Sequence, residues 1–414
     1  MKKIITSAGL VALGAASLNA ADGLSRIESS KFWTASITLR GFYDDNINTV
    51  PKSLKESSYG FEVRPSITLN FPLEQTFLSL GYTYDLRYYF DRDPKNDDQS
   101  HEVNFKLDHA FNERFRVQAS DNLSIFQEPN VFDGTTPTRT DGDNLHNRGS
   151  IDFTGQLTEL MGLNIGYANN LWDYDAEGVG SRSALLDRDE HLAHIDLRWN
   201  LTPEWVGLIG YQFGFNDYDG KEAMFFDPFT GAKVTSDDKD SYNHYVYVGA
   251  DYKLSTQLSA AARVGAQYTD YRNIDGQNDW SPYVDASLTY TYLPGSTVQG
   301  GVRHSRIATD QSTAISAQDF TLDQEATTFY LAVNHKITAQ LTGNLLLQYQ
   351  NAEFHGGFAD DERDNIYMVG LNLDYKFNPH WGVEAGYNWD YLDTDVGDRS
   401  YHRNRVYLGL RATY

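Results

Sequence analysis

Long stretches of the sequence alternate between apolar and polar residues with a period of two. In residues 59–71, the odd positions from Tyr59 to Phe71 are apolar, and the even positions from Gly60 to Asn70 are polar or glycine. Residues 193–201 and 369–377 repeat this pattern. A period of two indicates β-strands with one apolar face and one solvated face. Because such runs extend over about 10 to 14 residues, they suit tilted membrane-spanning strands better than ordinary globular strands.

A short template also recurs along the chain: apolar, polar, apolar or aromatic, polar, bulky apolar, then a turn residue. The bulky positions of its eight copies are Phe71, Phe111, Leu157, Leu201, Leu254, Tyr292, Ile337 and Phe377, and a ninth copy stops at Tyr414. Only a few residues separate each bulky position from the next alternating run, so these connections are tight turns. The connections at the other ends of the hairpins are long and polar. Nine long loops and eight short turns therefore join 18 strands.

This difference between the two ends of every hairpin is typical of outer-membrane barrels, which have short periplasmic turns and longer extracellular loops. After the first 20 residues, no run of 18 apolar residues could form a membrane-spanning helix, so only a closed barrel could cross a bilayer. The sequence predicts an all-β fold, a transmembrane antiparallel up-and-down β-barrel of about 18 strands in the cell outer membrane. The alternative is a secreted soluble β-domain, which does not explain the unequal hairpin ends.

The first 20 residues have the features of a secretory signal peptide. Lys2 and Lys3 precede an apolar stretch over residues 4–16, and the small residue Ala20 offers a cleavage site. The predicted organisation is a signal peptide at 1–20, a short periplasmic segment at 21–31 and the barrel at 32–414.

Composition excludes several classes of function. The chain has no cysteine, which excludes disulfides, thiolate catalysis and cysteine-bound zinc. Its formal charge of −23 disfavours nucleic-acid binding. No nucleophile elbow or zinc-spaced histidine pair is present, so we expect no catalytic residue, no metal site and no cofactor. The remaining enzyme alternative is a hydrolase at the barrel rim that would use His304, Ser305, His355 or His402.

The polar faces of the strands should line the interior. An 18-stranded barrel is on the order of 35 Å across, too wide for side chains to fill, which predicts a water-filled pore. The predicted pore-lining residues are Arg40, Glu62, Arg64, Asp85, Arg87, Lys106, Asp152, Asp196, Arg198, Asp251, Arg263, Asp285, Arg303, Lys336, Asp374, Lys376 and Arg411. The wider inward set adds Arg116, Lys253, Arg405, Asp108 and Glu384. Its thirteen basic and nine acidic residues leave four positive charges and predict a weak anion preference, with Arg64, Arg198, Arg263 and Arg303 as the main contributors.

Two further patterns concern the barrel wall. Aromatic residues should form a lower girdle (Phe71, Trp199, Tyr252, Tyr292, Phe377) and an upper girdle (Tyr88, Trp172, Phe215, Tyr268, Tyr391). Glycine recurs on the polar face in Leu80-Gly81-Tyr82, Ile165-Gly166-Tyr167, Ile209-Gly210-Tyr211 and Ala385-Gly386-Tyr387, and more loosely around Gly265 and Gly301, where it would relieve crowding. Tyr414 should be part of the signal that the barrel assembly machinery reads during insertion.

One early segment and the strand after it resemble a known family. Gly41-Phe42-Tyr43-Asp44-Asp45-Asn46-Ile47, Gly60-Phe61-Glu62-Val63-Arg64-Pro65 and the terminal tyrosine are similar to the putative β-barrel porin 2 family. The resemblance implies an outer-membrane barrel of the kind that accompanies exopolysaccharide export in Gram-negative bacteria, and it carries over no catalytic residue.

The expected function is a channel for hydrophilic solutes, with exopolysaccharide as one solute. The alternative is a non-conducting structural or assembly component of an export complex. The expected partners are outer-membrane lipid and lipopolysaccharide, the assembly machinery, polysaccharide and export proteins.

Overall fold

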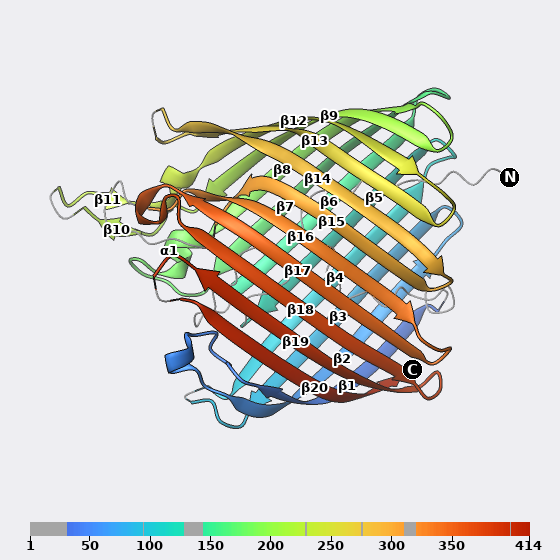
Figure 1. Ribbon diagram of the computed structural model, residues 1–414, viewed down its shortest axis with the longest axis horizontal. Helices are drawn as coiled ribbons and strands as arrows, with labels where there is room; N and C mark the ends of the chain where they lie inside the picture. Colours follow the sequence, from blue (N-terminus) through green and yellow to red (C-terminus); the bar gives the residue numbers. More distant parts are fainter. Residues whose placement is uncertain are drawn as a thin grey trace.

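A computed structural model describes residues 31–93, 95–127, 144–227, 230–274, 276–309, 320–397 and 399–414. An 18-stranded antiparallel sheet closes on itself through pairing of its first and last strands (Figure 1). One set of alternate strands comprises β1 (Trp33–Asp44), β3 (Thr76–Tyr89), β5 (Phe115–Phe126), β7 (Met161–Tyr174), β9 (Trp205–Tyr218), β13 (Leu258–Tyr271), β15 (Ser296–Ile307), β17 (Leu341–His355) and β19 (Trp381–Thr394). The strands that run in the opposite direction are β2 (Ser58–Pro72), β4 (Asp97–Ala110), β6 (Asn144–Gln156), β8 (Arg188–Asn200), β12 (Ser241–Lys253), β14 (Asn278–Leu293), β16 (Asp323–Lys336), β18 (Arg363–Lys376) and β20 (Tyr401–Thr413).

The remaining regular elements lie in the long loops. A separate hairpin pairs β10 (Phe225–Phe226) with β11 (Lys233–Val234), and α1 (Arg182–Leu186) is a single helical turn. Short 3₁₀ turns occupy Lys52–Leu54, Ser236–Lys239 and Gly357–Ala359. No helix in the described part of the chain is long and apolar enough to cross a membrane. The predicted signal peptide, and the segment after it up to residue 30, lie outside the described residues.

The predicted strand number, closure and hairpin asymmetry are confirmed. Each long strand pairs with its neighbours in sequence, with β9 joined directly to β12. Eight connections contain only two to four residues, and all of them lie at the end of the barrel opposite α1 and the β10–β11 hairpin (Figure 1). The bulky template positions, from Phe71 to Tyr414, lie at this short-turn end. By the general rule for such barrels, this end faces the periplasm and the long loops face outward.

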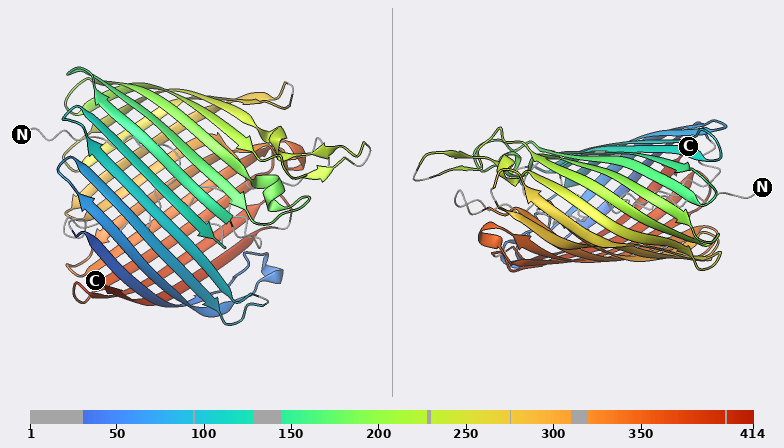
Figure 2. Two further views of the ribbon diagram at one scale, coloured as in Figure 1. Left: turned by 180° about the vertical axis from the view of Figure 1, so that it is seen from behind. Right: turned by 90° about the horizontal axis from the view of Figure 1, so that it is seen from above.

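The barrel is flattened. Strands β12–β20 form one broad wall and β1–β9 form the opposite wall, as the two perpendicular views show (Figures 1 and 2). We call these the β12–β20 wall and the β1–β9 wall. The two closing strands, β1 and β20, meet at one of the narrow sides, and the barrel interior therefore lies between two facing sheets.

Each wall has an apolar outer face and a polar inner face. On the outer face, Val248 and Leu408 are about 60% exposed, at 61% and 63%. On the inner face, Glu384 is fully buried among its neighbours. Because side chains alternate along each strand, the residues beside the outward apolar positions face inside, and Leu192 and Leu208 are apolar residues among them.

One predicted girdle position is wrong. Trp172 lies on the inner face, where it is only 5% exposed and stacks on His146 with a ring separation of 3.7 Å. The outward positions of β7 are odd-numbered, since Ile165 and Tyr167 are exposed, and Trp172 is even-numbered. Trp172 therefore packs under the extracellular loops instead of facing lipid.

Candidate functional site: the charged inner wall

All seventeen residues predicted to line the pore lie on the inner face of the barrel by strand alternation. The outward neighbours of these residues mark the opposite face: Phe61 beside Glu62 is 40% exposed, and Ile195 and Leu197 flank Asp196 at similar exposure. Most of the inward charges are paired across strands. Many of those pairs belong to two networks at different places on the wall, while Arg116 on β5 pairs separately with Asp108 on β4.

The first network spans the closing strands. Arg40 on β1 binds Glu62 on β2 at 2.8 Å and also pairs with Glu384 on β19. Glu384 also pairs with Arg411 on β20, so one buried carboxylate joins two arginines. Arg40 lies over the ring of Tyr407 at 4.7 Å. These contacts bridge the β1–β20 closure from the inside.

The first network continues onto the β1–β9 wall. Arg87 approaches Glu62 at 3.5 Å and Asp85 at 3.4 Å. Arg64 lies 3.8 Å from Glu102, an inward carboxylate that the sequence analysis did not include. The positive charge of these arginines is therefore balanced locally.

The second network joins β6–β9 to β12–β15. The Asp251 carboxylate on β12 forms ion pairs with Arg198 on β8 at 2.7 Å and with Arg263 on β13 at 2.8 Å. Arg303 on β15 lies 3.5 Å from Asp285 on β14. Arg198 and Asp251 are separated by the whole of β9, so their side chains meet across that strand.

A second contact crosses β9 at a glycine. Tyr247 on β12 lies across Gly210 on β9, and its hydroxyl donates a 2.5 Å hydrogen bond to Asp196 on β8. A Cβ added to Gly210 would clash with the tyrosine ring. His194 crosses Gly166 in the same way toward Asp152, which lies 3.4 Å away.

Two further glycines have the same environment. Tyr407 lies over Gly386, and Tyr330 lies over Gly301 with its hydroxyl oxygen 2.5 Å from the position of an added Cβ. The predicted relief of crowding thus has a specific cause, which is a long side chain that crosses the glycine strand. The sequence does show tyrosines at inward positions of the strands, such as Tyr247, Tyr330 and Tyr407. Only the strand register shows which glycine each of them covers.

The extracellular mouth contains a separate junction. The β14–β15 pairing stops at Val284–His304, although β14 extends to Asn278 and β15 to Ile307. In place of β14, the side-chain amide of Gln267 on β13 bonds both the N–H and the C=O of Arg306, each at 2.9 Å. The Arg306 guanidinium then binds Asp279 at 2.7 Å.

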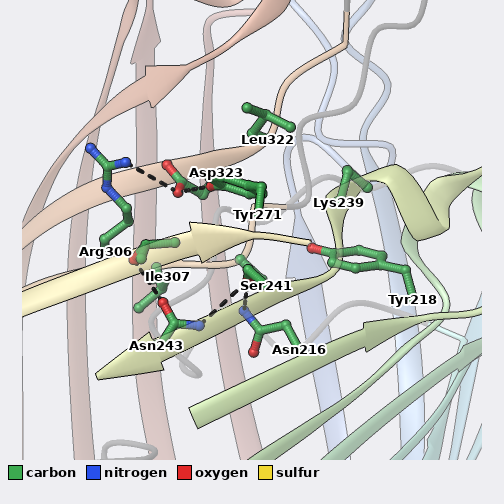
Figure 3. A pocket seen from close by; sticks show the side chains of 12 residues that line it. Asn216, Tyr218, Lys239, Ser241, Asn243, Tyr271, Arg306, Ile307, Leu322 and Asp323 are labelled. Atoms are coloured by element: carbon green, nitrogen blue, oxygen red, sulfur yellow. Dashed lines mark hydrogen bonds and ion pairs between the residues drawn. The ribbon is translucent and has the colours of Figure 1, made fainter. Parts of the chain in front are cut away.

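A small cavity adjoins this junction (Figure 3). Arg306 and Asp323 face each other in it, and the Tyr271 hydroxyl donates to Asp323. On the other side, Asn216 and Asn243 hydrogen-bond Ser241. Its volume, about 10 Å³, is that of roughly one water molecule. This cavity is therefore a polar junction between loop and wall, too small for a solute.

The long loops pack together above one part of the mouth. Met224 and Val234 from the β9–β12 loop contact Tyr271 and Phe320, which come from β13 and the β15–β16 loop. Lys239 is buried against the ring of Tyr218 at 4.2 Å. The loops over β7–β16 thus form a common apolar cluster.

Two loop carboxylates have pKa values raised to about 6. Burial raises the pKa of Asp187 to about 6, although the carboxylate accepts hydrogen bonds from the Ser183 hydroxyl and the Tyr174 N–H. Burial likewise raises the pKa of Asp240 to about 6, against an opposing hydrogen bond from the Tyr218 N–H. Asp187 directly precedes β8 and holds the end of β7 through the Tyr174 N–H. Asp240 directly precedes β12 and holds the end of β9 through the Tyr218 N–H.

The rim-hydrolase residues do not form one group. His304 and Ser305 are consecutive on β15, so their side chains point to opposite faces. His304 contacts Thr327 at 2.8 Å and Glu325 at 2.9 Å, while His402 contacts Lys55 at 3.2 Å near the first loop. Among the described residues, no three histidine, aspartate or glutamate side chains are arranged to hold a metal ion.

The family model for putative beta-barrel porin 2 matches residues 32–414, which include every strand of the barrel. The chain belongs to this family. It is therefore an outer-membrane, porin-like β-barrel, as the resemblance of residues 41–47 and 60–65 implied.

Several solved structures are similar in fold. A BenF-like porin from Pseudomonas fluorescens is 11% identical, with a TM-score of 0.48 over 92% of this chain and 99% of that one. OccAB4 from Acinetobacter baumannii is 10% identical, with a TM-score of 0.45 over 93% and 99%. The outer membrane protein opdK from Pseudomonas aeruginosa is 9% identical, with a TM-score of 0.44 over 92% and 99%. No curated protein matches the sequence.

Proposed function

We propose that this porin-family barrel is a diffusion channel for hydrophilic solutes. The observation that carries the proposal is the charged inner wall, where arginines and carboxylates from both walls of the barrel face inward in paired networks. A wall of this kind is compatible with water throughout the interior, whereas an apolar interior would exclude ions. Passage of exopolysaccharide is a narrower version of the proposal, supported only by the family resemblance.

The charge preference of the channel should not come from the four arginines named from the sequence. Arg64, Arg198, Arg263 and Arg303 each lie within 4 Å of a carboxylate. Paired charges produce a weak field beyond a Debye length of about 8 Å. We still expect a weak anion preference, but from basic residues that lack such partners.

Purified protein in planar lipid bilayers tests the proposal. Discrete, stable current steps in potassium chloride are expected, with a reversal potential that favours chloride in a salt gradient. A folded barrel that inserts but carries no current would instead favour the alternative of a structural or assembly component. Heat-modifiable migration on gels shows whether the barrel is folded in both cases.

A further inference from the structure

The lipid-facing side of the β1–β9 wall contains a polar interruption. Asp121 lies near the middle of β5 on the outer face, because alternation places it on the same side as the exposed Ile125. Asn147 on β6 and Asn169 on β7 face outward by the same argument. These three strands lie side by side in the middle of the wall (Figure 2). We call Asp121, Asn147 and Asn169, with Gly149 between them, the β5–β7 polar notch.

The notch lies within the apolar belt and not at the rim. On each of its strands, the outer face continues toward the extracellular end with apolar residues: Leu123 and Ile125 on β5, Leu145 on β6, and Leu171 on β7. Among the described residues, Asp121 is the one outward carboxylate with two apolar outward residues between it and the extracellular end of its strand. Ionisable residues at membrane depth are rare and mark functional sites.

Other outward polar residues belong to the rim. Thr327, Asn351 and Asn365 face outward on β16, β17 and β18, but the outer face of these strands continues upward into the charged residues Glu325, Glu353 and Arg363. Those strands therefore become polar once and stay polar up to the loops. The β5–β7 wall becomes apolar again above the notch.

Hydrogen bonds inside the notch leave both a donor and acceptors without partners. Asn147 Nδ2 donates to Asp121 Oδ1 at 3.1 Å. Within the described part of the chain, Asp121 Oδ2 accepts no hydrogen bond and forms no ion pair, and the Asn147 amide keeps its carbonyl oxygen and its second N–H. Asn169 is engaged toward the rim, where it donates to Asp189 and contacts His191 at 3.2 Å. Polar groups that face hydrocarbon without partners are costly.

Glycine leaves space beside the free carboxylate oxygen. Gly149 pairs with Asp121 on one side and with Asn169 on the other. A Cβ added to Gly149 would lie 3.1 Å from Asp121 Oδ2, and no other described atom beyond its chain neighbours lies within 4 Å. The outer face is therefore hollowed next to the carboxylate. Small residues at such positions let two membrane-embedded surfaces approach closely.

The free groups fit a second copy of the same surface. Acyl chains offer neither donors nor acceptors, and a cationic group offers donors only, which would leave the Asn147 N–H without an acceptor. An amide that keeps one donor and one acceptor can pair with the same amide across a two-fold axis, because an isologous contact brings each group onto its own copy. The carboxylate oxygen beside Gly149 is a further acceptor for that contact.

We propose that the β5–β7 polar notch is the centre of a symmetric contact between two copies of the barrel in the outer membrane. The two-fold axis is parallel to the membrane normal and passes close to Asn147, so that the two broad β1–β9 walls face each other. The contact does not require that either barrel conducts, and it stands apart from the proposed channel function.

Disulfide cross-linking tests the contact, since the chain has no cysteine of its own. Ile151→Cys places a thiol on the outer face of β6 beside the notch, and Ile67→Cys on β2 is the matched control, because the two isoleucines are 49% and 44% exposed. In outer membranes treated with copper phenanthroline, Ile151→Cys should form a product with the mass of two chains about three- to tenfold faster than Ile67→Cys, the effect of one or two membrane hydrogen bonds.

Substitutions in the notch test its part in the contact. Asp121→Leu combined with Asn147→Leu should remove the advantage of Ile151→Cys, whereas Asp121→Asn keeps an acceptor and should retain most of it. Asn365→Leu removes a lipid-facing amide from the β12–β20 wall and should leave cross-linking unchanged. Heat-modifiable migration on gels shows whether each variant is folded.

The outcomes separate a second copy from other occupants. Equal cross-linking at Ile151→Cys and Ile67→Cys, or a product that contains a different protein, would overturn the inference. A folded leucine variant that cross-links as fast as the unaltered notch would also overturn it. The comparison of the two cysteine positions leaves the notch intact, so it decides the inference even if the leucine variant does not fold.

Discussion

At the scale of single residues, the inner wall depends on glycines that are crossed by a side chain from the next strand. Gly210 is the clearest case, because Tyr247 passes directly over it to reach Asp196. Gly81 occupies the same place in its own repeat but has only ordinary contacts, with the Thr68 hydroxyl oxygen 3.6 Å from an added Cβ. The same sequence pattern therefore hides two different environments.

These environments predict opposite effects of one substitution. Gly210→Ala should destabilise the barrel by about 1–3 kcal/mol, because the new methyl group displaces the Tyr247 ring. Gly81→Ala should be neutral or stabilising, since glycine in a strand costs about 0.5–1 kcal/mol relative to alanine. Urea unfolding in detergent micelles measures both. Equal loss of stability in the two variants would contradict the role assigned to Tyr247.

The tyrosines of the glycine repeat have a role that the sequence did not reveal. Tyr82, Tyr167 and Tyr211 follow the glycine on the outer face, and each hydrogen-bonds a histidine on the next strand: His101 at 2.9 Å, His191 at 2.7 Å and His244 at 2.8 Å. In each case the histidine lies diagonally from its tyrosine in the strand register. Only the register brings these pairs together.

At the scale of elements, the β1–β20 seam is an unbroken antiparallel ladder of nine residue pairs. Tyr414 extends the seam beyond β20, since its N–H donates to the Ala35 carbonyl at 2.8 Å and its ring stacks on Trp33 at 5.2 Å. The predicted assembly signal therefore also has a packing role. A substitution must separate the two.

Tyr414→Ala should lower the amount of folded barrel in the outer membrane several-fold if the ring is read during insertion. Trp33→Ala is the matched control, because it removes the same stacking contact and leaves Tyr414 in place. Immunoblots of heat-modifiable protein in membrane fractions compare them. An equal decrease in both variants would reduce the role of Tyr414 to packing.

The loop cluster should respond to pH through Asp187 and Asp240. Both have folded-state pKa values of about 6, above the usual value near 3.9, so the packed loops bind protons more tightly than unpacked loops. Loop packing should therefore strengthen as pH falls from 7.5 through 6. Nearby charges include Asp173 and Asp219 for Asp187, and Asp217, Asp237 and Arg272 for Asp240.

Hydrogen exchange of residues 219–240, corrected for intrinsic rates, measures this change. Slower exchange is expected at pH 5.5 than at pH 7.5 in the wild type. The double variant Asp187→Asn and Asp240→Asn keeps the hydrogen-bond acceptors and should lose most of the difference. A pH effect of the same size in this variant would assign it to other groups.

The sequence predicted those features that depend on residues close together in the chain. Strands and turns were predictable because a period of two and a turn residue are visible within a few positions. Ion pairs such as Arg198–Asp251 were not, because they join residues 53 positions apart across an intervening strand. Trp172 was misassigned because tryptophan occurs both in lipid-facing girdles and in barrel interiors. Counting positions along the strand from the outward Ile165 would have placed Trp172 on the inner face.

At the scale of the whole molecule, the arrangement of loops and turns fixes an orientation in the membrane. The chain contains no cysteine, so single introduced cysteines report on that orientation without interference. A cysteine at Thr230, in the β10–β11 hairpin, should react with a membrane-impermeant maleimide on intact cells. A cysteine at Gln340, in the turn between β16 and β17, should react only after the outer membrane is broken. The reverse pattern would invert the assignment of the two mouths.

The β1–β20 seam also constrains how fast and in what order the barrel can fold. It pairs Thr38 with Arg411, which are 373 positions apart, so this contact has a very high contact order and a large loop-closure cost. Until β20 arrives, β1 remains an open edge that can pair with another chain. Hairpins can form early and locally, but the sealing step must be the last. Kinetic protection of the β1 edge during that interval, more than final stability, should therefore determine the yield of correctly closed barrels.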